Sequence, residues 1–348
     1  MTTQQLNQAQ LNAQNRALLL QTATRMMKYL QPVSIAPNQT GRVNLLNTGI
    51  TTNLRVELTF TSSAVATPFF TPTKAGSMFT AKFVDYDTTV RFNLRETDVY
   101  IINTFRKGKD GFLSNFDYSP SSGVYENQFV FDLPLAYHKD IDLRGALYTN
   151  VSGGTAYLEF TNNSSNTLNF QVIQEFLAPQ YIANQLPLPQ LDLNTVNEYV
   201  YVVSNDNLIA SSQKYIDLPQ NRQVVSAWAW YFNGTGLESD LFELLVNGNT
   251  KLIEYDDLST ILELDRRFIE DITSTYMYSV LKGSYLGSTS GAGFMPLRYF
   301  DFTAQPLITA NYGAIQFRFT PATVGSGANV NLLYNNLYLK GTVGGIAQ

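Results

Sequence analysis

The chain has 348 residues, 44% of them hydrophobic and 13% aromatic, which is enough for two cores because domains commonly hold about 100–200 residues. It contains no cysteine and one histidine, His138, so disulfide bonds, thiolate metal sites and cysteine nucleophiles are excluded. The formal net charge is −5, yet every charged residue before Glu57 is basic. With little chemistry available near neutral pH, the composition argues against an enzyme.

The first predicted element is a helix over residues 3–30. This stretch lacks proline and glycine and is rich in Gln, Ala, Leu and Met, and Gln31-Pro32 follows as a stop. At about 1.5 Å per residue such a helix is about 40 Å long. We assign residues 1–35 to an N-terminal arm. No secretory signal is recognisable in it, so we expect the protein to be made in the cytoplasm.

The charges of this arm are Arg16, Arg25 and Lys28. One interpretation is a helix docked along its own or a neighbouring subunit. The other is an arm lying near anionic lipid headgroups, where each basic residue contributes about 1 kcal/mol. The residues alone leave both open. The dispersed basic residues are a poor phosphate-binding cluster, so we predict no specific nucleic-acid site.

Between Val43 and Leu177 the chain alternates short apolar runs with turn residues, which is typical of successive β-strands. The expected strands are Leu54–Thr61, Lys82–Tyr86, Val90–Leu94, Asp98–Phe105, Phe129–Tyr137, Ala156–Thr161 and Phe170–Phe176. About eight antiparallel strands in this length favour a jelly roll.

Three prolines within residues 178–189 predict a boundary, because they cannot all lie in central strands. We therefore expect one jelly roll at residues 36–182 and a second at residues 183–348. The second has strand-like runs at Tyr199–Ser204, Lys214–Leu218 and Val224–Phe232, a helix at Asp256–Ser274 and a loop at Gly287–Gly293. The predicted fold class is all-β, with two tandem eight-stranded jelly rolls, an N-terminal helix and short helices in loops.

Two short sequence patterns each recur about 160 residues later in the chain. Pro134-Leu135-x-Tyr137 recurs as Pro296-Leu297-x-Tyr299. The strand-like run Ala156–Thr161 recurs as Ile315–Thr320, and both runs alternate apolar and polar residues. The repetition predicts two similar domains in tandem.

Few residues suggest chemistry. The acidic residues between Glu254 and Asp271 lack a regular ligand spacing and are interpreted as a solvated helix face, not as a calcium or glycosidase site. Trp228, Trp230 and Phe232 alternate on one strand face, as core residues or as a sugar-stacking platform. His138 lies near no serine motif, and the glycine-rich loop lacks a Gly-Lys-Ser/Thr ending, so we predict no catalytic, cofactor or metal site.

The segment from Leu133 to Asn163 closely resembles part of the major capsid protein of tectiviruses, tailless phages with a membrane beneath the capsid. The matching residues are Leu133 to Tyr137, Asp142, Leu143, Gly145, Ala146, Asn150, Val151, Leu158 to Phe160, Asn162 and Asn163. Among them we select as motif residues Pro134, Leu135, Tyr137, Asp142, Leu143, Gly145, Leu158 and Phe160. The resemblance implies a double jelly roll whose trimer forms a pseudo-hexagonal capsomer.

The resemblance therefore predicts a major capsid protein of an icosahedral virion, assembled in the host cytoplasm. The implied partners are two further copies in a homotrimer, neighbouring capsomers, penton and minor capsid proteins, and an internal viral membrane reached by the arm with Arg16, Arg25 and Lys28. Two alternatives stay open. One is a carbohydrate-binding or receptor-binding β-sandwich protein that uses Trp228 and Trp230. The other is a minor vertex or spike protein of the same virion.

Overall fold

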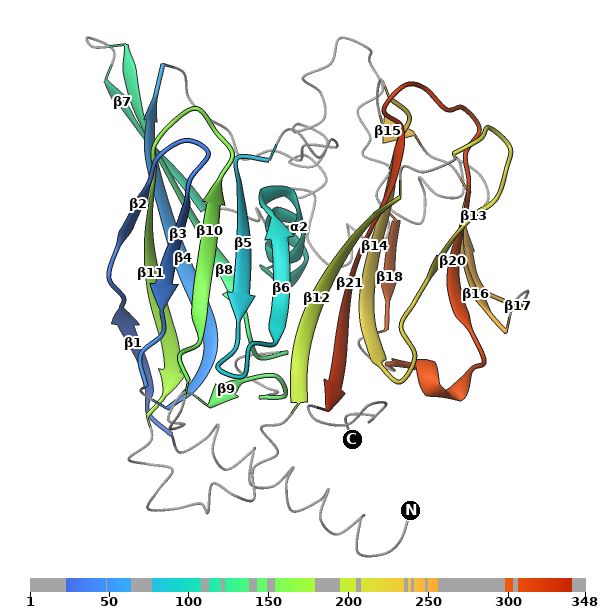
Figure 1. The fold of residues 1–348 in the computed structure, drawn as a ribbon, viewed down its shortest axis with the longest axis horizontal. Coiled ribbons are helices and arrows are strands. Elements are labelled where there is room, and N and C mark those ends of the chain that lie inside the picture. The colour runs from blue at the N-terminus through green and yellow to red at the C-terminus, as the bar shows by residue number, and fades with distance from the viewer. Residues whose placement is uncertain are drawn as a thin grey trace, which may run out of the picture.

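A computed structural model places two β-rich halves side by side, with their long strands running along the same direction (Figure 1). The structure describes residues 23–47, 49–63, 77–107, 113–119, 123–137, 143–148, 154–178, 195–204, 208–234, 237–238, 241–247, 250–255, 298–302 and 306–339. No helix among these residues is both long and apolar enough to cross a lipid bilayer.

The first half contains two facing sheets. One has the order β1-β11-β4-β8-β7, with β2 also paired to β11 and β9 to β4, and the other has the order β3-β10-β5-β6. The bounds are β1 Arg25–Tyr29, β2 Val33–Ile35, β3 Thr40–Asn44, β4 Ile50–Ser62, β5 Phe79–Val84, β6 Val90–Arg95, α2 Glu96–Lys107, β7 Leu113–Ser119, β8 Val124–Pro134, β9 Leu147–Tyr148, β10 Tyr157–Asn162 and β11 Leu168–Leu177.

The second half is built in the same way. Its sheets have the orders β12-β21-β14, with β15, β18 and β19 also paired to β14, and β13-β20-β16-β17. The bounds are β12 Thr195–Ser204, β13 Lys214–Asp217, β14 Gln223–Phe232, β15 Leu237–Glu238, β16 Leu241–Val246, β17 Thr250–Tyr255, β18 Arg298–Asp301, β19 Leu307–Ile308, the 3-10 helix η3 Thr309–Asn311, β20 Ile315–Thr320 and β21 Asn329–Leu339.

The main pairing paths of the two halves correspond. The path β1-β11-β4-β8 has the same connections as β12-β21-β14-β18, and the path β3-β10-β5-β6 has the same connections as β13-β20-β16-β17. Each half therefore repeats one antiparallel sandwich topology. The repeat expected from the sequence is present in the fold, and the architecture is a double jelly roll.

The repeated runs Ala156–Thr161 and Ile315–Thr320 occupy equivalent strands, β10 and β20. In both, buried apolar residues alternate with partly exposed ones. The other repeated pattern does not occupy equivalent positions. Pro134 ends β8, whereas Pro296 precedes β18 and lies outside the described residues. The strands β8 and β18 correspond, because they pair with the equivalent strands β4 and β14. The Pro-Leu-x-Tyr pattern therefore falls at the end of one strand and at the start of the other, and this part of the predicted repeat is wrong.

Each half buries an aromatic core between its sheets. In the first half, Phe160 stacks on Phe170 with ring centroids 4.0 Å apart, and Phe79 stacks on Phe131 at 5.3 Å. In the second, the rings of Tyr231 and Phe319 lie 4.7 Å apart. Burying a side chain of this size stabilises a fold by about 1.5–3 kcal/mol, so these rings dominate the packing.

The predicted helix over residues 3–30 is wrong at its carboxyl end. Arg25–Tyr29 forms β1 and pairs antiparallel with β11, Met26 opposite Phe176 and Tyr29 opposite Ile173. Good helix formers adopt a strand here because the edge of β11 offers a full row of backbone partners, and such tertiary pairing outweighs differences in propensity of less than about 1 kcal/mol per residue. Residues 3–22 lie outside the described part.

The strand predicted at Asp98–Phe105 is a helix, α2. The Asp98 carboxylate accepts a hydrogen bond from the backbone N–H of Arg95 at 2.9 Å, and Glu96 and Asp98 place negative charge in the first turn. Both features stabilise a helix start. Asn103 then ties the helix to β8, because its amide donates to the Asp132 carbonyl at 2.7 Å.

The remaining predicted strands exist with shifted ends. The run predicted at Lys82–Tyr86 is centred earlier, in β5, and the run at Phe129–Tyr137 starts and ends earlier, in β8. The predicted domain boundary, the helix at Asp256–Ser274 and the loop at Gly287–Gly293 lie outside the described residues.

Candidate functional site: the junction between the two halves

The two halves meet where β6 lies beside β12, near the middle of Figure 1. The two strands are parallel, with Phe92 opposite Tyr199, and this pairing makes one continuous sheet across the molecule. A parallel pair between the halves differs from the antiparallel pairs inside each half. The junction is therefore a separate interface that holds one sandwich against the other.

Arg95, at the end of β6, is the central cation of this junction. Its Nη2 and Nε atoms lie 2.9 and 3.1 Å from the two carboxylate oxygens of Asp98. Its guanidinium carbon lies 3.5 Å from the ring centroid of Tyr201 in β12. Burial raises the pKa of the Tyr201 hydroxyl, although the Arg95 charge opposes the rise. The arginine thus joins the start of α2 to the second half by an ion pair and a cation–π contact.

A second contact crosses the junction from α2. The Nη1 atom of Arg106 donates a hydrogen bond to the Tyr199 hydroxyl at 2.9 Å. Tyr199 itself is buried and packs in the core cluster of the first half. The strand β12 thus contributes aromatic rings to a core that is built mainly by residues far away in the sequence.

Arg91 and Asp85 form a fully buried ion pair behind β6. The Arg91 Nη2 atom lies 2.8 Å from the Asp85 carboxylate, and their side chains are 2% and 0% exposed. Arg91 Nη1 also donates to the backbone carbonyl of Gly145. Charge burial of this kind is tolerated only where partners satisfy both groups, so this pair fixes the position of the loop that contains Gly145.

Gly145 touches the second half directly. Its φ is +87°, and a Cβ atom built on it lies 2.3 Å from the Cβ of Asn197 in β12 and 2.7 Å from the Leu135 carbonyl. Only glycine fits such a left-handed residue under another strand. This close contact explains why position 145, one of the motif residues selected from the sequence, is a glycine.

The other described motif residues lie around the same loop or in the core. The backbone N–H groups of Leu135 and Ala136 both donate to the Thr52 carbonyl, at 3.2 and 2.8 Å, and that of Tyr137 donates to the Arg144 carbonyl at 2.7 Å. Pro134, Leu135 and Leu143 are buried around the loop, and Leu158 and Phe160 are buried in β10. Asp142 lies outside the described residues. The structure therefore divides the described motif residues between the Gly145 loop beneath the junction and the core of the first half.

Trp228 and Trp230 lie inside the molecule. They are 3% and 0% exposed and belong to the core cluster of the first half, whereas Ala227 and Ala229, which alternate with them, belong to the core cluster of the second. The Trp230 ring stacks near that of Tyr201, with centroids 6.3 Å apart. A sugar platform requires exposed rings, so the interpretation of these tryptophans as a carbohydrate-binding surface is wrong.

Glu96 is a buried carboxyl group at the first residue of α2. It is 5% exposed, and its Oε2 atom accepts a hydrogen bond from the Met78 N–H at 2.8 Å. Desolvation raises its pKa from 4.5 to about 7, and the Met78 hydrogen bond only partly opposes this. A carboxyl group with a raised pKa favours the folded state when protonated. Its stabilising contribution is complete below about pH 4.5 and is lost as the pH rises through about 7.

Glu96→Gln is therefore expected to flatten the pH dependence of stability. One pKa unit corresponds to about 1.4 kcal/mol, so the wild type should lose about 3 kcal/mol of unfolding free energy from this group between pH 4.5 and pH 8. Urea unfolding at pH 5 and pH 8 measures the difference. Glu126→Gln, at an exposed position of β8, is the matched control. Equal pH dependence in the wild type and Glu96→Gln would contradict the prediction.

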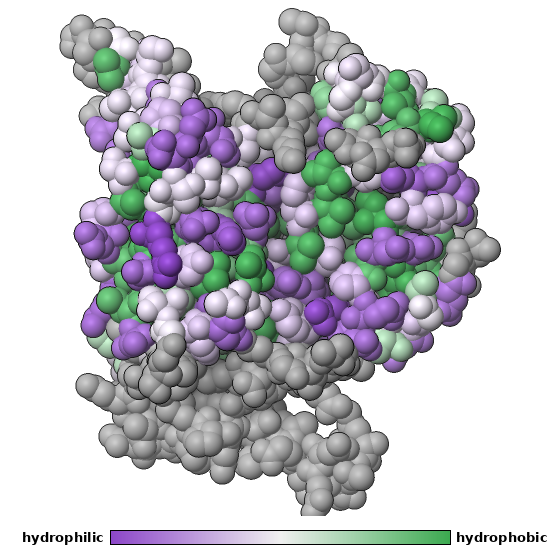
Figure 2. Space-filling model, viewed as in Figure 1, coloured by the Kyte–Doolittle hydropathy of each residue, from purple (hydrophilic) through white to green (hydrophobic). Residues whose placement is uncertain are grey.

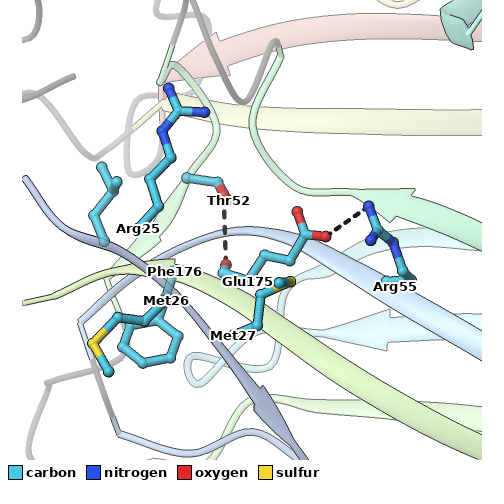
Figure 3. Close-up of a pocket in the computed structure, with 8 residues that line it drawn as sticks. Arg25, Met26, Met27, Thr52, Arg55, Glu175 and Phe176 are labelled. Carbon is cyan, nitrogen blue, oxygen red and sulfur yellow. Dashed lines mark hydrogen bonds and ion pairs between the residues drawn. The ribbon is translucent and has the colours of Figure 1, made fainter. Parts of the chain in front are cut away.

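The outer edge of the first half carries a pocket of about 290 Å³ beside β1 (Figure 3). Its polar wall is an ion pair between Arg55 Nη2 and Glu175 Oε1 at 2.9 Å, and Arg55 Nε lies 3.2 Å from Asp132. The neighbouring carboxylates raise the pKa of Arg55 against the effect of its burial. Met26 and Met27 of β1 line the apolar side.

Of the three predicted arm residues, Arg25 and Lys28 lie in β1, where every residue is exposed, and Arg16 lies outside the described residues. His138, Asp256 to Asp271 and the glycine-rich loop also lie outside them. On the face in Figure 2, hydrophobic surface forms separate patches among hydrophilic side chains.

The architecture is similar to that of several solved structures. The chain matches the crystal structure of the STIV MCP with a TM-score of 0.62 at 12% identity, covering 91% of this chain and 97% of that one. The fold is the double jelly roll of viral major capsid proteins. The atomic structure of Sulfolobus Turreted Icosahedral Virus gives 0.62 at 13% identity, with 90% and 91% covered, and the major capsid protein P2 of bacteriophage PM2 gives 0.55 at 12% identity, with 92% and 100% covered. No protein-family model and no curated protein sequence matches the chain.

Sequence reasoning missed the charged junction residues Arg91, Arg95, Glu96 and Asp98. Only one signal pointed to them. Asp98 follows Arg95 by three residues and precedes an apolar run, which is the spacing of a capped helix start with a basic partner. The contacts of Arg91 with Gly145 and of Arg95 with Tyr201 join distant segments, and no local pattern predicts them.

Proposed function

We propose that the chain is the major capsid protein of an icosahedral virus, a structural protein without catalytic activity or cofactor. The observation that carries this proposal is the doubled sandwich, because 91% and 92% of the chain align with two solved capsid proteins. Two matched sandwiches joined through the β6–β12 strand pair and the Arg95–Tyr201 contact form one building block. A single block of this kind suits a protein whose activity is to occupy a fixed place in a shell.

The assembly we propose is a homotrimer that forms a pseudo-hexagonal capsomer. Three copies of a two-sandwich chain supply six similar units, and six units around one axis make a tile that fills a hexagonal lattice. Capsomers then meet neighbouring capsomers, penton proteins and minor capsid proteins through the mixed polar and apolar surface. We place the protein in the virion shell, assembled in the host cytoplasm.

The sequence resemblance to tectiviruses favours a capsid with an internal membrane. We propose that residues 1–22 with Arg16, together with the adjoining β1 residues Arg25 and Lys28, face that membrane. Figure 1 has β1 near the lower end of the first half. The basic side chains there are exposed and match an anionic lipid surface in charge.

The purified full-length protein is expected to be a trimer in solution. Light scattering coupled to size-exclusion chromatography should give a mass near three times the 38.9 kDa chain, unchanged on tenfold dilution. Glu126→Gln, which alters an exposed β8 side chain, should give the same mass. A mass of one chain at every concentration would contradict the capsomer and with it the proposed function.

A further inference from the structure

Among the described residues of the first half, the two most exposed large apolar side chains lie in the strand β1. Met27 and Tyr29 are 62% and 68% exposed, and Met26 is 42% exposed. One edge of β1 pairs with β11, and among the described strands none pairs with its other edge. An uncovered edge strand with apolar side chains is a surface that natural proteins normally protect or use.

The corresponding strand of the second half is β12, and it is covered. β12 pairs with β21 as β1 pairs with β11, and its second edge lies against β6 of the first half. Its aromatic residue Tyr199 is 4% exposed. The two corresponding strands therefore differ: the neighbouring sandwich covers β12, whereas β1 is exposed.

The covering strand also has a counterpart. β6 pairs with β5 on one edge and with β12 on the other, whereas its equivalent β17 pairs with β16 and with no other described strand. Among the described strands, therefore, β6 and β12 form one complete junction, whereas the outer edges of β1 and β17, which correspond to the two sides of that junction, have no partner strand. In Figure 1, β1 and β17 lie at opposite sides of the molecule.

We propose that β17 of one copy lies parallel to β1 of the next copy and covers Met27 and Tyr29, repeating between chains the β6–β12 junction found within the chain. The proposal rests on the trimer proposed above and identifies its seam. The occupant is a second copy of this chain, because the chain already presents the complementary strand in the complementary position. Three in-chain junctions and three such seams close a ring of six sandwiches.

Disulfide trapping tests the seam without background, because the chain has no cysteine. Lys28→Cys in β1 is combined in turn with Lys251→Cys, Leu252→Cys and Ile253→Cys in β17. Successive residues of a strand face opposite sides, so the three pairs sample both faces and the register. Adjacent strands lie about 4.8 Å apart, within the range of a disulfide. After mild oxidation, at least one pair should give covalent dimers and trimers on a non-reducing gel.

Two controls define the result. Each single-cysteine variant should stay monomeric on the gel, and so should Lys28→Cys with Lys214→Cys, because β13 lies at the opposite edge of its sheet from β17. If light scattering shows a trimer but all three β1–β17 pairs remain uncrosslinked, the seam is elsewhere and the proposed function stands. If the wild type is a monomer, the proposed function itself fails.

A charge at the seam gives an independent readout. Met27→Glu with Tyr29→Glu alters exposed side chains, so each chain should still fold, but each of the three seams must desolvate two carboxylates. The concentration at which trimers dissociate should rise at least about tenfold. Ile209→Glu is the matched control, since Ile209 is 63% exposed and precedes β13. Unchanged dissociation of the double variant would overturn the proposal.

Discussion

Gly145→Ala is expected to lower the free energy of unfolding by about 3 kcal/mol and to loosen the junction between the halves. The left-handed φ of +87° costs an alanine about 1–2 kcal/mol, and the added carbon would lie 2.3 Å from the Asn197 Cβ and 2.9 Å from its backbone N. Neither neighbour is a flexible chain end that can move aside. The strain therefore falls on the contact with β12.

Gly327→Ala separates the two contributions. Gly327 has a φ of +79°, similar to that of Gly145, but a Cβ there meets nothing within 4 Å. This control should cost only the backbone part, about 1–2 kcal/mol. Urea unfolding of the three proteins, followed by tryptophan fluorescence because Trp228 and Trp230 lie in the junction, measures both losses. Equal losses for the two variants would show that the close approach to Asn197 carries no energy.

The sandwich strands could be predicted from the sequence where period-2 alternation is strong. Buried and partly exposed residues alternate in β10, in β20 and in β4 from Leu54 onward, and all three strands were expected within a few residues of their ends. The pattern works because one face of each strand packs on the core and the other faces outward. The doubled architecture followed from the same alternation at β10 and β20.

The helix α2, the strand β1 and the junction could not be predicted from alternation. Val99 to Ile102 are all buried, so the run fits a buried strand and a buried helix equally well, and only the Asp98 cap distinguishes them. β1 consists of good helix formers, and its conformation is decided by the open edge of β11. The junction itself depends on contacts between segments that one sequence cannot bring together.

Arg91→Met is expected to destabilise the fold by about 3–5 kcal/mol, more than any other single charge removal considered. The substitution keeps most of the side-chain volume but leaves the fully buried Asp85 carboxylate without its guanidinium partner, and the Gly145 carbonyl without its donor. Removing one member of a buried ion pair costs this much because an uncompensated charge stays in a medium that solvates it poorly. Urea unfolding at pH 7 measures the loss.

The comparison that isolates the buried charge uses two further variants. Arg42→Met makes the same chemical change at an exposed residue of β3, whose guanidinium lies 3.5 Å from the Tyr157 ring centroid, and should cost about 1 kcal/mol or less. Arg91→Met combined with Asp85→Asn removes both charges and should recover part of the stability that Arg91→Met loses. If the double variant is no more stable than Arg91→Met, the unpaired carboxylate is not the cause, and the loss belongs to the Gly145 loop that Arg91 holds against β12.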